Sequence, residues 1–285
     1  MNFIKLQATG NDFVLIDGRS MRPRDWSALA KAMCHRHFGV GADGILLILP
    51  SKVADFYMRM FNPDGSEAEA CGNGLRCAAR YAADNRLAKR PEIKIETPAG
   101  MKIARIKSKN SIQVAMGKPE LKPSSIPVLV ERKGIPEASP VIDYPLTMGK
   151  MKLKITCISI GNPHAVCFLE QPVADFPMAE VGPKVEHHPM FPNRVNFEIV
   201  NIISRKKLKA RVWERGADET LSCGTGACAI AVASGLKKLI DNPVDITLPG
   251  GTLTVNWDGE GEVFLSGPAD IVFEGKWNDR KGGGK

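Results

Sequence analysis

Two cysteines of this 285-residue chain lie in the same unusual context. Cys71 lies within E-A-E-A-C-G-N-G-L-R-C-A-A-R-Y-A (67–82), and Cys223 lies within E-T-L-S-C-G-T-G-A-C-A-I-A-V-A (219–233). In both segments the cysteine precedes Gly-x-Gly and an apolar run, which predicts a loop that leads into a helix. Each thiol is therefore expected at a helix N-terminus, where unpaired N–H groups and the helix dipole favour a thiolate.

A pair of matched thiols suits acid–base chemistry at a carbon stereocentre. If the two helix starts face each other across an interdomain cleft, one thiolate can remove a proton from one face of the carbon. The opposite thiol then donates a proton to the other face, and the configuration is inverted. Cysteine suits both roles because its ordinary pKa of about 8.5 can be lowered toward neutrality at a helix N-terminus. The two thiols would titrate as a coupled pair.

The acidity of an amino-acid Cα–H is the harder problem for such an enzyme. Backbone N–H groups after each cysteine, in Gly72-Asn73 and in Gly224-Thr225, can hold the α-carboxylate and stabilise the charge that spreads into it. Loss of one such donor typically costs about 3 kcal/mol, or about a hundredfold in rate. We expect no organic cofactor, because the sequence has no Schiff-base lysine context and G-V-G-A-D-G (39–44) leads into a predicted strand.

Other interpretations of the two cysteines explain less. Structural zinc sites use pairs such as C-x-x-C, and the spacings here are C-x5-C and C-x4-C. Redox exchange also uses C-x-x-C, and a single nucleophile would leave the second copy unexplained. Two buried structural cysteines would seldom repeat within Gly-x-Gly. That interpretation does suit the remaining cysteines, Cys34, Cys77, Cys157, Cys167 and Cys228.

The two cysteine segments belong to a longer internal repeat. Gly161-Asn162-Pro163-His164 corresponds to Gly10-Asn11-Asp12-Phe13, and Pro249-Gly250-Gly251 corresponds to Pro98-Ala99-Gly100, in the same order as the cysteines. A duplication that gave two similar domains explains this order. The Gly-x-Gly helices are apolar on nearly every face, so each must be enclosed by its domain. We predict an α/β (α+β) fold with two pseudo-symmetric domains, each a curled, mostly antiparallel β-sheet or barrel around a central helix.

Local patterns predict the elements that position the cysteines. In the first half we expect a helix over 25–37 and strands over 3–6, 13–17, 56–61, 93–97, 102–106 and 111–116. The Pro-rich, polar segment 117–125 is the expected domain boundary, which gives an N-terminal domain over 1–118 and a C-terminal domain over 119–269. Residues 278–285 are expected to form a flexible tail.

The formal net charge of +8 permits a nucleic-acid partner but does not predict one. The densest basic cluster, S-R-K-K-L-K-A-R (204–211), is typical of a strand with a solvated face, and no nucleic-acid-binding motif accompanies it. No apolar run is long enough to span a membrane, and no secretory signal pattern opens the chain. Seven cysteines without such a signal favour free thiols in a reducing cytoplasm.

These motifs resemble those of the diaminopimelate epimerase family. The similarity covers A-T-G-N-D-F (8–13), F-N-P-D-G-S-E-A-E-A-C-G-N-G-L-R-C (61–77), G-N-P-H (161–164), R-V-N-F (194–197) and W-E-R-G-A-D-E-T-L-S-C-G-T-G-A-C-A (213–229). It implies a pyridoxal-phosphate-independent isomerase that interconverts LL- and meso-diaminopimelate in lysine and cell-wall precursor biosynthesis. It also implies that a C-terminal strand, 270–277 here, returns to the first domain. We also expect a homodimer with a small-molecule substrate.

The resemblance implies a role for each matching residue. Cys71 and Cys223 would be the acid–base pair, and His164 would line the site. The substrate-binding positions would be Asn11, Asn62, Gly72, Asn73, Asn162, Asn196, Glu214, Arg215, Gly224 and Thr225. An arginine such as Arg215 can bind a carboxylate through two parallel hydrogen bonds. The sequence departs from the family pattern twice: some members have Gln where Gly44 lies, and Gly is common at the position of Asp218.

Two alternatives to diaminopimelate epimerization are open to the sequence. Proline and hydroxyproline racemases also use two cysteines, but their first motif resembles C-G-H-G and their second resembles D-R-S-P-C-G-T-G. Here Cys71 precedes Gly72-Asn73, and Cys223 follows Glu219-Thr220-Leu221-Ser222, which favours diaminopimelate as the substrate. A non-catalytic thiol or binding module would give the repeated motif no purpose.

Overall fold

A computed structural model describes residues 1–68, 71–88, 91–108, 110–131, 136, 138–149 and 151–278 of the chain. The chain divides into two compact units. Unit 1 comprises Met1–Val114 with Gly267–Lys285, and unit 2 comprises Ala115–Ser266. Except for Asn278, the tail expected over 278–285 lies outside the described residues. Among the described helices, none combines the length and the apolar character needed to cross a membrane.

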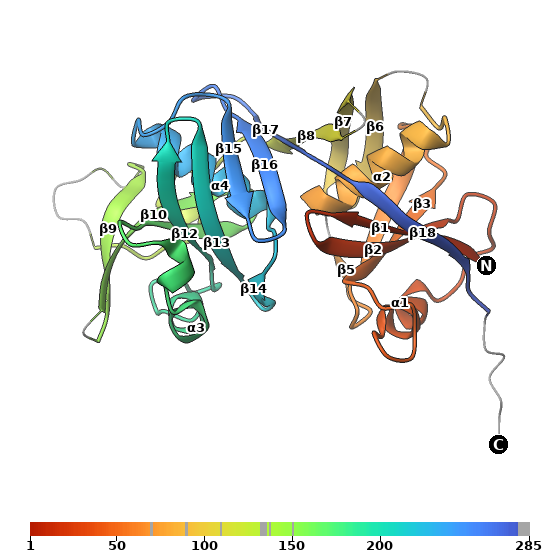
Figure 1. The fold of residues 1–285 in the computed structure, drawn as a ribbon, viewed down its shortest axis with the longest axis horizontal. Coiled ribbons are helices and arrows are strands. Elements are labelled where there is room, and N and C mark those ends of the chain that lie inside the picture. Colours follow the sequence, from red (N-terminus) through yellow and green to blue (C-terminus); the bar gives the residue numbers. More distant parts are fainter. Residues whose placement is uncertain are drawn as a thin grey trace. The chain divides into compact units, whose positions relative to one another are not determined.

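Unit 1 contains nine strands and two helices among its described residues (Figure 1). Its elements are β1 (Asn2–Ala8), β2 (Asn11–Asp17), α1 (Trp26–Cys34), β3 (Gly44–Leu49), β4 (Phe56–Phe61), β5 (Glu67–Ala68), α2 (Gly72–Asp84), β6 (Glu92–Thr97), β7 (Gly100–Ser108), β8 (Ser111–Gly117) and β18 (Asp270–Lys276). The last strand, β18, pairs antiparallel with the first strand, β1. Both ends of the described chain therefore belong to the same sheet.

Unit 2 follows the same plan with its own nine strands among the described residues (Figure 1). Its elements are η1 (Pro123–Ser125), β9 (Val141–Met148), β10 (Met151–Ser159), β11 (Pro163–Phe168), η2 (Val173–Asp175), α3 (Met178–Glu186), β12 (Asn196–Ser204), β13 (Lys207–Glu214), β14 (Asp218–Thr220), α4 (Gly224–Leu236), β15 (Val244–Leu248), β16 (Gly251–Asn256) and β17 (Val263–Gly267).

Strand pairing repeats between the two units in order and in direction. In unit 1, β1 pairs antiparallel with β2, β2 parallel with β3, β3 antiparallel with β4 and β4 parallel with β6. In unit 2, β10, β11, β12, β13 and β15 pair with the same sequence of directions. The pairing of β18 with β1 corresponds to that of β9 with β10. The predicted fold class, with its internal repeat, is confirmed.

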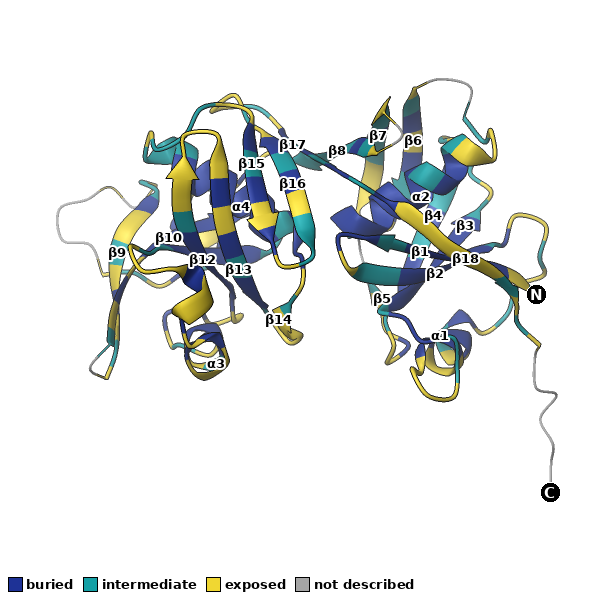
Figure 2. Ribbon diagram, viewed as in Figure 1, coloured by how far each residue is buried: buried dark blue, intermediate teal, exposed yellow. Residues whose placement is uncertain are grey.

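The central helices α2 and α4 are largely enclosed within their units. In unit 1, α2 packs against β1, β2, β3 and β7, and in unit 2, α4 packs against β10, β11, β12, β15 and β16. Figure 2 shows buried residues along both helices. Small Ala and Gly side chains let the strands approach closely, and every residue of α4 from Gly226 to Ser234 is buried. This burial explains why the runs after the two cysteines are apolar on nearly all faces.

Three local expectations differ from the structure. The first helix ends at Cys34 rather than at residue 37, because the side chain of His35 accepts N–H bonds from His37 and Phe38 and stabilises a turn. The basic segment 204–211 is interrupted at 205–206, between β12 and β13, although its lysines do alternate with buried residues. Neither β9 nor α3 was expected, because prolines at 145, 177 and 183 obscure their patterns.

Candidate active site

Cys71 occupies the N-cap of α2, as its sequence context predicted. Its backbone is extended (φ −137°, ψ 123°), so the side chain lies at the point where the loop becomes a helix. The Sγ atom lies 3.9 Å from Oδ1 of Asn11, and Nδ2 of Asn73 donates to the same oxygen over 3.3 Å. Three residues expected in the site are therefore in contact within unit 1.

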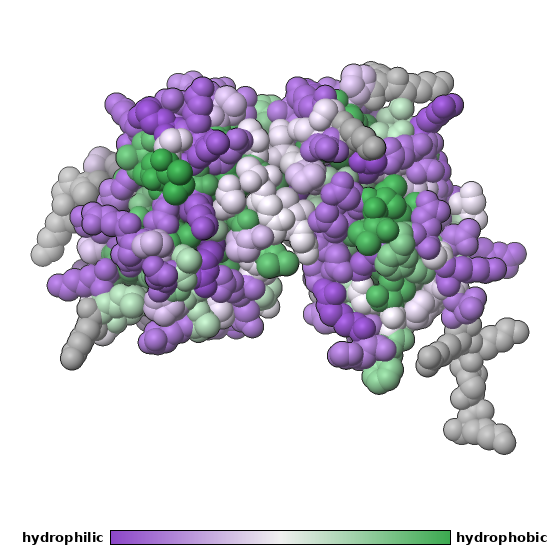
Figure 3. All heavy atoms as spheres, viewed as in Figure 1, coloured by the Kyte–Doolittle hydropathy of each residue, from purple (hydrophilic) through white to green (hydrophobic). Residues whose placement is uncertain are grey.

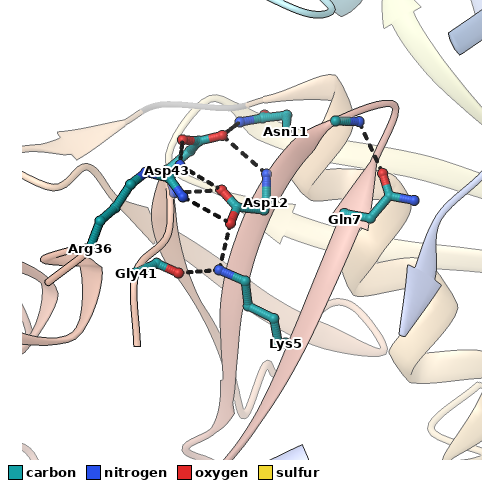
Figure 4. A network of polar contacts seen from close by, with 8 residues as sticks. Lys5, Gln7, Asn11, Asp12, Arg36, Gly41 and Asp43 are labelled. Carbon is teal, nitrogen blue, oxygen red and sulfur yellow. Dashed lines mark hydrogen bonds and ion pairs between the residues drawn. The ribbon is translucent and has the colours of Figure 1, made fainter. Parts of the chain in front are cut away.

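A charged network fixes the orientation of the Asn11 amide (Figure 4). Nδ2 of Asn11 donates to Oδ2 of Asp43 over 2.7 Å, which turns Oδ1 toward Cys71. Arg36 bridges Asp43 and Asp12, and the buried Lys5 also binds Asp12. Burial would raise the pKa of Asp12, but hydrogen bonds and charge from Lys5 and Arg36 outweigh burial and hold it below its usual value. Asp12 is therefore ionised near neutral pH, where it pairs with Lys5 and Arg36.

Arg76 is a second support for this part of unit 1. Its side chain is fully buried, and its hydrogen-bond partners include Oδ1 of Asn73 at 2.8 Å, Oγ1 of Thr9 at 3.3 Å, and the carbonyls of Gly72 and Pro268. Since Oδ1 of Asn73 accepts from Arg76, its Nδ2 is directed at Asn11. The first turn of α2 is thereby held in one geometry.

Cys223 occupies the N-cap of α4 in unit 2, also as predicted. Its Sγ accepts the backbone N–H of Gly226 over 3.3 Å and lies 3.4 Å from Oγ1 of Thr225. The thiol is almost fully buried, with 4% of the residue exposed. The Cys223 sulfur therefore accepts a backbone hydrogen bond, whereas the Cys71 sulfur lies near an acceptor oxygen, Oδ1 of Asn11.

The lowered pKa expected for the Cys223 thiol is wrong. Burial raises its pKa well above the usual value, and the nearby Glu214 and Glu198 carboxyls raise it further. Hydrogen bonds from Thr225 and Gly226 act in the opposite direction but are weaker. The sequence motif revealed the helix N-terminus but not the depth of burial or the two acidic neighbours. Here desolvation outweighs the helix dipole.

His164 and Glu198 form a buried pair beside this thiol. His164 lies on β11 and Glu198 on β12, and neither side chain has exposed surface. Nδ1 of His164 lies 2.6 Å from Oε1 of Glu198, and Nε2 lies 2.9 Å from Oδ1 of Asn162. Burial raises the pKa of Glu198, an effect that the neighbouring His164 opposes. Asn162 and His164, two residues expected in the site, are therefore linked directly.

Three more expected residues, Asn196, Glu214 and Arg215, lie at or next to strand ends in unit 2. Asn196 is buried at the start of β12, where it donates to the carbonyl of Pro163 and accepts the N–H of Arg215. Glu214 accepts a hydrogen bond from Thr220 at the end of β13. The exposed guanidinium of Arg215 donates to the carbonyl of Asn193.

Asn62 lies apart from these contacts. It forms the turn after β4, where its side chain and backbone N–H both donate to Ser66. The hydrogen bond of its side chain goes to Ser66 rather than to Cys71, Asn11 or Asn73. Gly72 and Gly224, in contrast, are the first residues of α2 and α4 directly after the two thiols.

The two departures from the family pattern have local structural reasons. A Cβ on Gly44 would lie 2.9 Å from the carbonyl oxygen of Phe61, so this backbone leaves no room for a glutamine without a shift. Asp218 adopts φ +59°, the left-handed conformation that glycine adopts without strain. The turn therefore keeps the geometry typical of glycine although its residue is aspartate.

Three supporting residues were not identified from the sequence: Asp43, Arg76 and Glu198. A lone carboxylate within the apolar strand N-F-E-I-V is an available signal for Glu198, because unpaired buried carboxyls are costly. An arginine inside an otherwise apolar helix is a comparable signal for Arg76. In the part of the chain that the structure describes, no group of three His, Cys, Asp or Glu residues could hold a metal ion.

Solved structures with the same fold define the class of protein. The chain superposes on a PhzF-family phenazine biosynthesis protein from Bacillus anthracis with a TM-score of 0.69 and 20% identity, covering 96% of this chain and 97% of that one. A hydroxyproline epimerase from Agrobacterium vitis, with bound trans-4-hydroxy-L-proline, gives a TM-score of 0.66 and 15% identity, covering 96% and 90%. The chain thus has the fold shared by the PhzF proteins and the proline racemases.

Sequence comparison identifies the family within this class. The family model of diaminopimelate epimerase matches residues 3–122 and 156–272. A diaminopimelate epimerase from Halothermothrix orenii is 45% identical over 282 residues, which covers 97% of each chain. One from Methanococcus maripaludis is 44% identical over 281 residues, covering 97% of this chain and 99% of that one. The chain belongs to the diaminopimelate epimerase family.

Proposed function

We propose that this protein is an isomerase that interconverts LL-2,6-diaminopimelate and meso-2,6-diaminopimelate. One observation carries the proposal: within a member of this family, the two repeated units each present a cysteine at the N-cap of their central helix. A single nucleophile needs one such cysteine, whereas a reaction that inverts a stereocentre through two bases needs two.

In the proposed reaction, Cys71 and Cys223 act on opposite faces of one α-carbon. The thiolate of one takes the α-proton and becomes a thiol, while the electron pair of the C–H bond spreads into the α-carboxylate. The thiol of the other then gives its proton to the opposite face and becomes a thiolate. The reverse direction exchanges the two roles, so each cysteine must be able to hold either state. Neither an organic cofactor nor a metal takes part in this proposal.

The raised pKa of Cys223 limits when its thiolate forms. Burial and the Glu214 carboxyl both disfavour the negatively charged thiolate of Cys223. A substrate ammonium group beside Glu214 would neutralise one of these opposing charges. We therefore propose that substrate binding helps to generate the reactive thiolate, which restricts proton abstraction to the occupied site.

Helix N-termini and amide side chains provide the proposed substrate contacts. The first N–H groups of α2 and α4 lack intrahelical partners by geometry, which suits them to bind the α-carboxylate. His164 supports the site through Asn162. The full proposed set is Asn11, Asn62, Gly72, Asn73, Asn162, Asn196, Glu214, Arg215, Gly224 and Thr225.

We propose that the protein acts in the cytoplasm, in the biosynthesis of lysine and of peptidoglycan precursors. All seven cysteines are free thiols, which supports a reducing compartment. The names of the 43–45% identical relatives support the substrate.

A homodimer is part of the same proposal. Three consecutive apolar residues of β18 are exposed: Ile271 (36%), Val272 (56%) and Phe273 (46%). A hydrophobic patch is visible over this strand in Figure 3. Sedimentation equilibrium of the wild type should give twice the chain mass, and Val272→Glu should shift the protein toward monomer. A monomeric wild type at micromolar concentration would contradict this part of the proposal.

Solvent deuterium exchange tests the proposed reaction directly. In deuterated water, the wild type should convert LL-diaminopimelate to the meso form with one deuterium at the inverted carbon. Cys71→Ser and Cys223→Ser should each slow inversion by at least a hundredfold while circular dichroism shows an unchanged fold. Racemization of proline in place of diaminopimelate, or full inversion by either serine variant, would reject the proposal.

A further inference from the structure

Glu198 is a fully buried carboxyl that the two-thiol reaction does not use. It lies in β12 with its Oε1 bound to His164, while its Oε2 has no hydrogen-bond partner among the described residues. An added Cβ on Gly226 would lie 2.9 Å from Oε1, so the carboxyl packs against the first turn of α4. The N–H of Gly226 is the donor to the Cys223 sulfur. Glu198 thus lies next to the residue that binds the thiol.

Unit 1 has an apolar pair at the corresponding positions. His164 is paired with Asn196 across β11 and β12, and Phe13 is paired with Gly44 across β2 and β3. Two residues further along, Glu198 corresponds to Leu46. Leu46 also packs on the equivalent glycine, since a Cβ on Gly74 would lie 3.1 Å from its Cδ2.

The comparison of the two units indicates a purpose for the polar pair. Phe13 and Leu46 are both fully buried, so apolar side chains can fill these two positions of the fold. A buried polar pair is often no more stable than apolar residues of similar volume. The stability of unit 2 therefore does not explain why it carries His164 and Glu198.

The hydrogen-bond inventory determines where the protons lie. Oδ1 of Asn162 can only accept, so Nε2 of His164 must carry a hydrogen. The 2.6 Å contact between Nδ1 and Oε1 then holds one proton, either as a neutral acid donating to a neutral ring or as an ion pair. An ion pair would leave negative charge on the unpartnered, buried Oε2, whereas a neutral acid makes Oε2 a carbonyl oxygen. The neutral pair is the less costly arrangement.

We propose that Glu198 is a positioning residue that acts as a neutral acid, donating its proton to Nδ1 of His164 and so fixing the Nε2–H of His164 on Asn162. This chain directs the Oδ1 of Asn162 inward and presents its Nδ2, a donor, toward a substrate anion. The role in catalysis rests on the proposed function, whereas the protonation of the pair does not.

The charges around Glu198 agree with this arrangement. The titratable groups that face it are His164 on β11, Glu214 on β13 and Cys223 at the start of α4. Burial raises the pKa of Glu198, and the neighbouring Glu214 raises it further, against the opposing effect of His164. As a neutral acid, Glu198 adds no negative charge beside Cys223, so its share in raising the pKa of that thiol disappears while that of Glu214 remains.

Nitrogen NMR of the ligand-free protein tests the protonation state without any turnover. In protein labelled with ¹⁵N-histidine, the His164 signals are assigned by their loss in His164→Phe. We expect a protonated Nε2 and an unprotonated, hydrogen-bonded Nδ1 at neutral pH. Two protonated ring nitrogens would show an ion pair and overturn the proposal, whether or not the protein epimerizes diaminopimelate.

Two variants at Glu198 test the positioning role. Glu198→Leu places in unit 2 the residue type that Leu46 provides in unit 1. It removes the donor to Nδ1 of His164, so kcat should fall about tenfold or more. Glu198→Gln keeps a neutral donor and should restore most of this loss, with a pH profile of kcat/KM like that of the wild type. An ionised Glu198 would instead make Glu198→Gln shift the acidic limb of that profile to lower pH, which would overturn the proposal.

The double variant His164→Phe/Glu198→Leu separates positioning from packing. It reproduces the Phe13/Leu46 pair of unit 1, so it should fold with a Tm close to that of the wild type. The proposal requires that kcat stay reduced in this folded variant, because Asn162 loses its partner. Wild-type kcat in the double variant would show that the pair only fills space and would overturn the positioning role.

Discussion

At the scale of single residues, the two thiols differ in the hydrogen-bonding atoms beside their sulfurs. The sulfur of Cys71 lies near an acceptor, Oδ1 of Asn11, while the sulfur of Cys223 accepts an N–H bond from Gly226. An acceptor favours a thiol and a donor favours a thiolate, but burial raises the pKa of Cys223 against its donors. At Cys223 the protein therefore sets the hydrogen bonds from Gly226 and Thr225, which lower the pKa, against desolvation, which raises it more.

The raised pKa of Cys223 predicts a loss of stability at alkaline pH. Its contribution is fully present below the unfolded-state pKa of about 8.5, and it falls as pH rises from there toward the higher folded-state pKa. The free energy of unfolding of the wild type should therefore decrease as pH rises above about 8.5. Urea unfolding at several pH values measures this, and Cys223→Ser should weaken the decrease.

The other buried thiols provide the control for that experiment. Burial also raises the pKa of Cys34 to about 12 and that of Cys167 to about 11. Cys167→Ser should thus weaken the alkaline decrease in the same direction without the loss of inversion expected for Cys223→Ser. An unfolding free energy that does not change with pH in this range would contradict the assigned burial of these thiols.

Asp43 is predicted to affect activity through Asn11. Asp43→Asn removes the charge that holds the Asn11 amide and the Arg36 bridge, so kcat/KM should fall about tenfold while Tm changes little. Asp84→Asn is a matched control, because Asp84 also binds an arginine and its side chain is 41% exposed, against 40% for Asp43. Equal activity in the two variants would remove Asp43 from the site.

At the scale of elements, helices whose start is marked by a recognisable motif or capping residue were predicted better than helices without such a mark. Cys71 and Cys223 each precede a helix as expected, because Gly-x-Gly marks the start, and Asp25 caps a helix that was expected to begin at that residue. Helix α3 was not expected, because its N-cap is Pro177 and its interior contains Pro183. The repeat itself contains the missing signal, since α1 lies between β2 and β3 just as α3 lies between β11 and β12.

The candidate site was predictable only where motifs mark it. Residues such as Asn162 and Thr225 lie beside the cysteines or within the repeat, so sequence order was sufficient to find them. Glu198 contacts His164 only because two strands pair in parallel, 34 residues apart in the chain. The pKa of Cys223 depends on such long-range neighbours and on burial, which no local pattern encodes.

The tight packing around Gly226 in the first turn of α4 leads to a further prediction. Gly226→Ala would place Cβ 2.9 Å from Oε1 of Glu198 and 3.2 Å from Cβ of Cys223, so it should destabilise the protein by about 1–3 kcal/mol. Gly74→Ala is the matched change in unit 1, where Cβ would meet a flexible Leu46 methyl at 3.1 Å. Gly74→Ala should cost less, and urea unfolding of both variants measures the difference. Equal costs would contradict the view that Glu198 is rigidly held.

At the scale of the whole molecule, the internal repeat gives one scaffold in which the two cysteines have different polar surroundings. The strand pairing of the two units matches in order and direction, and both central helices begin at a cysteine. The surroundings differ: unit 1 has a charged network behind Asn11, and unit 2 has a buried acid and imidazole behind Asn162. The repeat therefore preserves the positions of the thiols, while side chains adapt each one separately.

The proposed inversion predicts how the whole protein responds to oxidation. Two sulfurs that act on the same carbon must come close to each other, so a thiol oxidant such as diamide should join Cys71 and Cys223 as a disulfide. Activity should disappear, and dithiothreitol should restore it. Peptide mass spectrometry identifies the bond, and Cys71→Ser is the control in which it cannot form. If the oxidised wild type kept full activity, or joined other cysteines while these two stayed reduced, the shared-carbon reaction would be wrong.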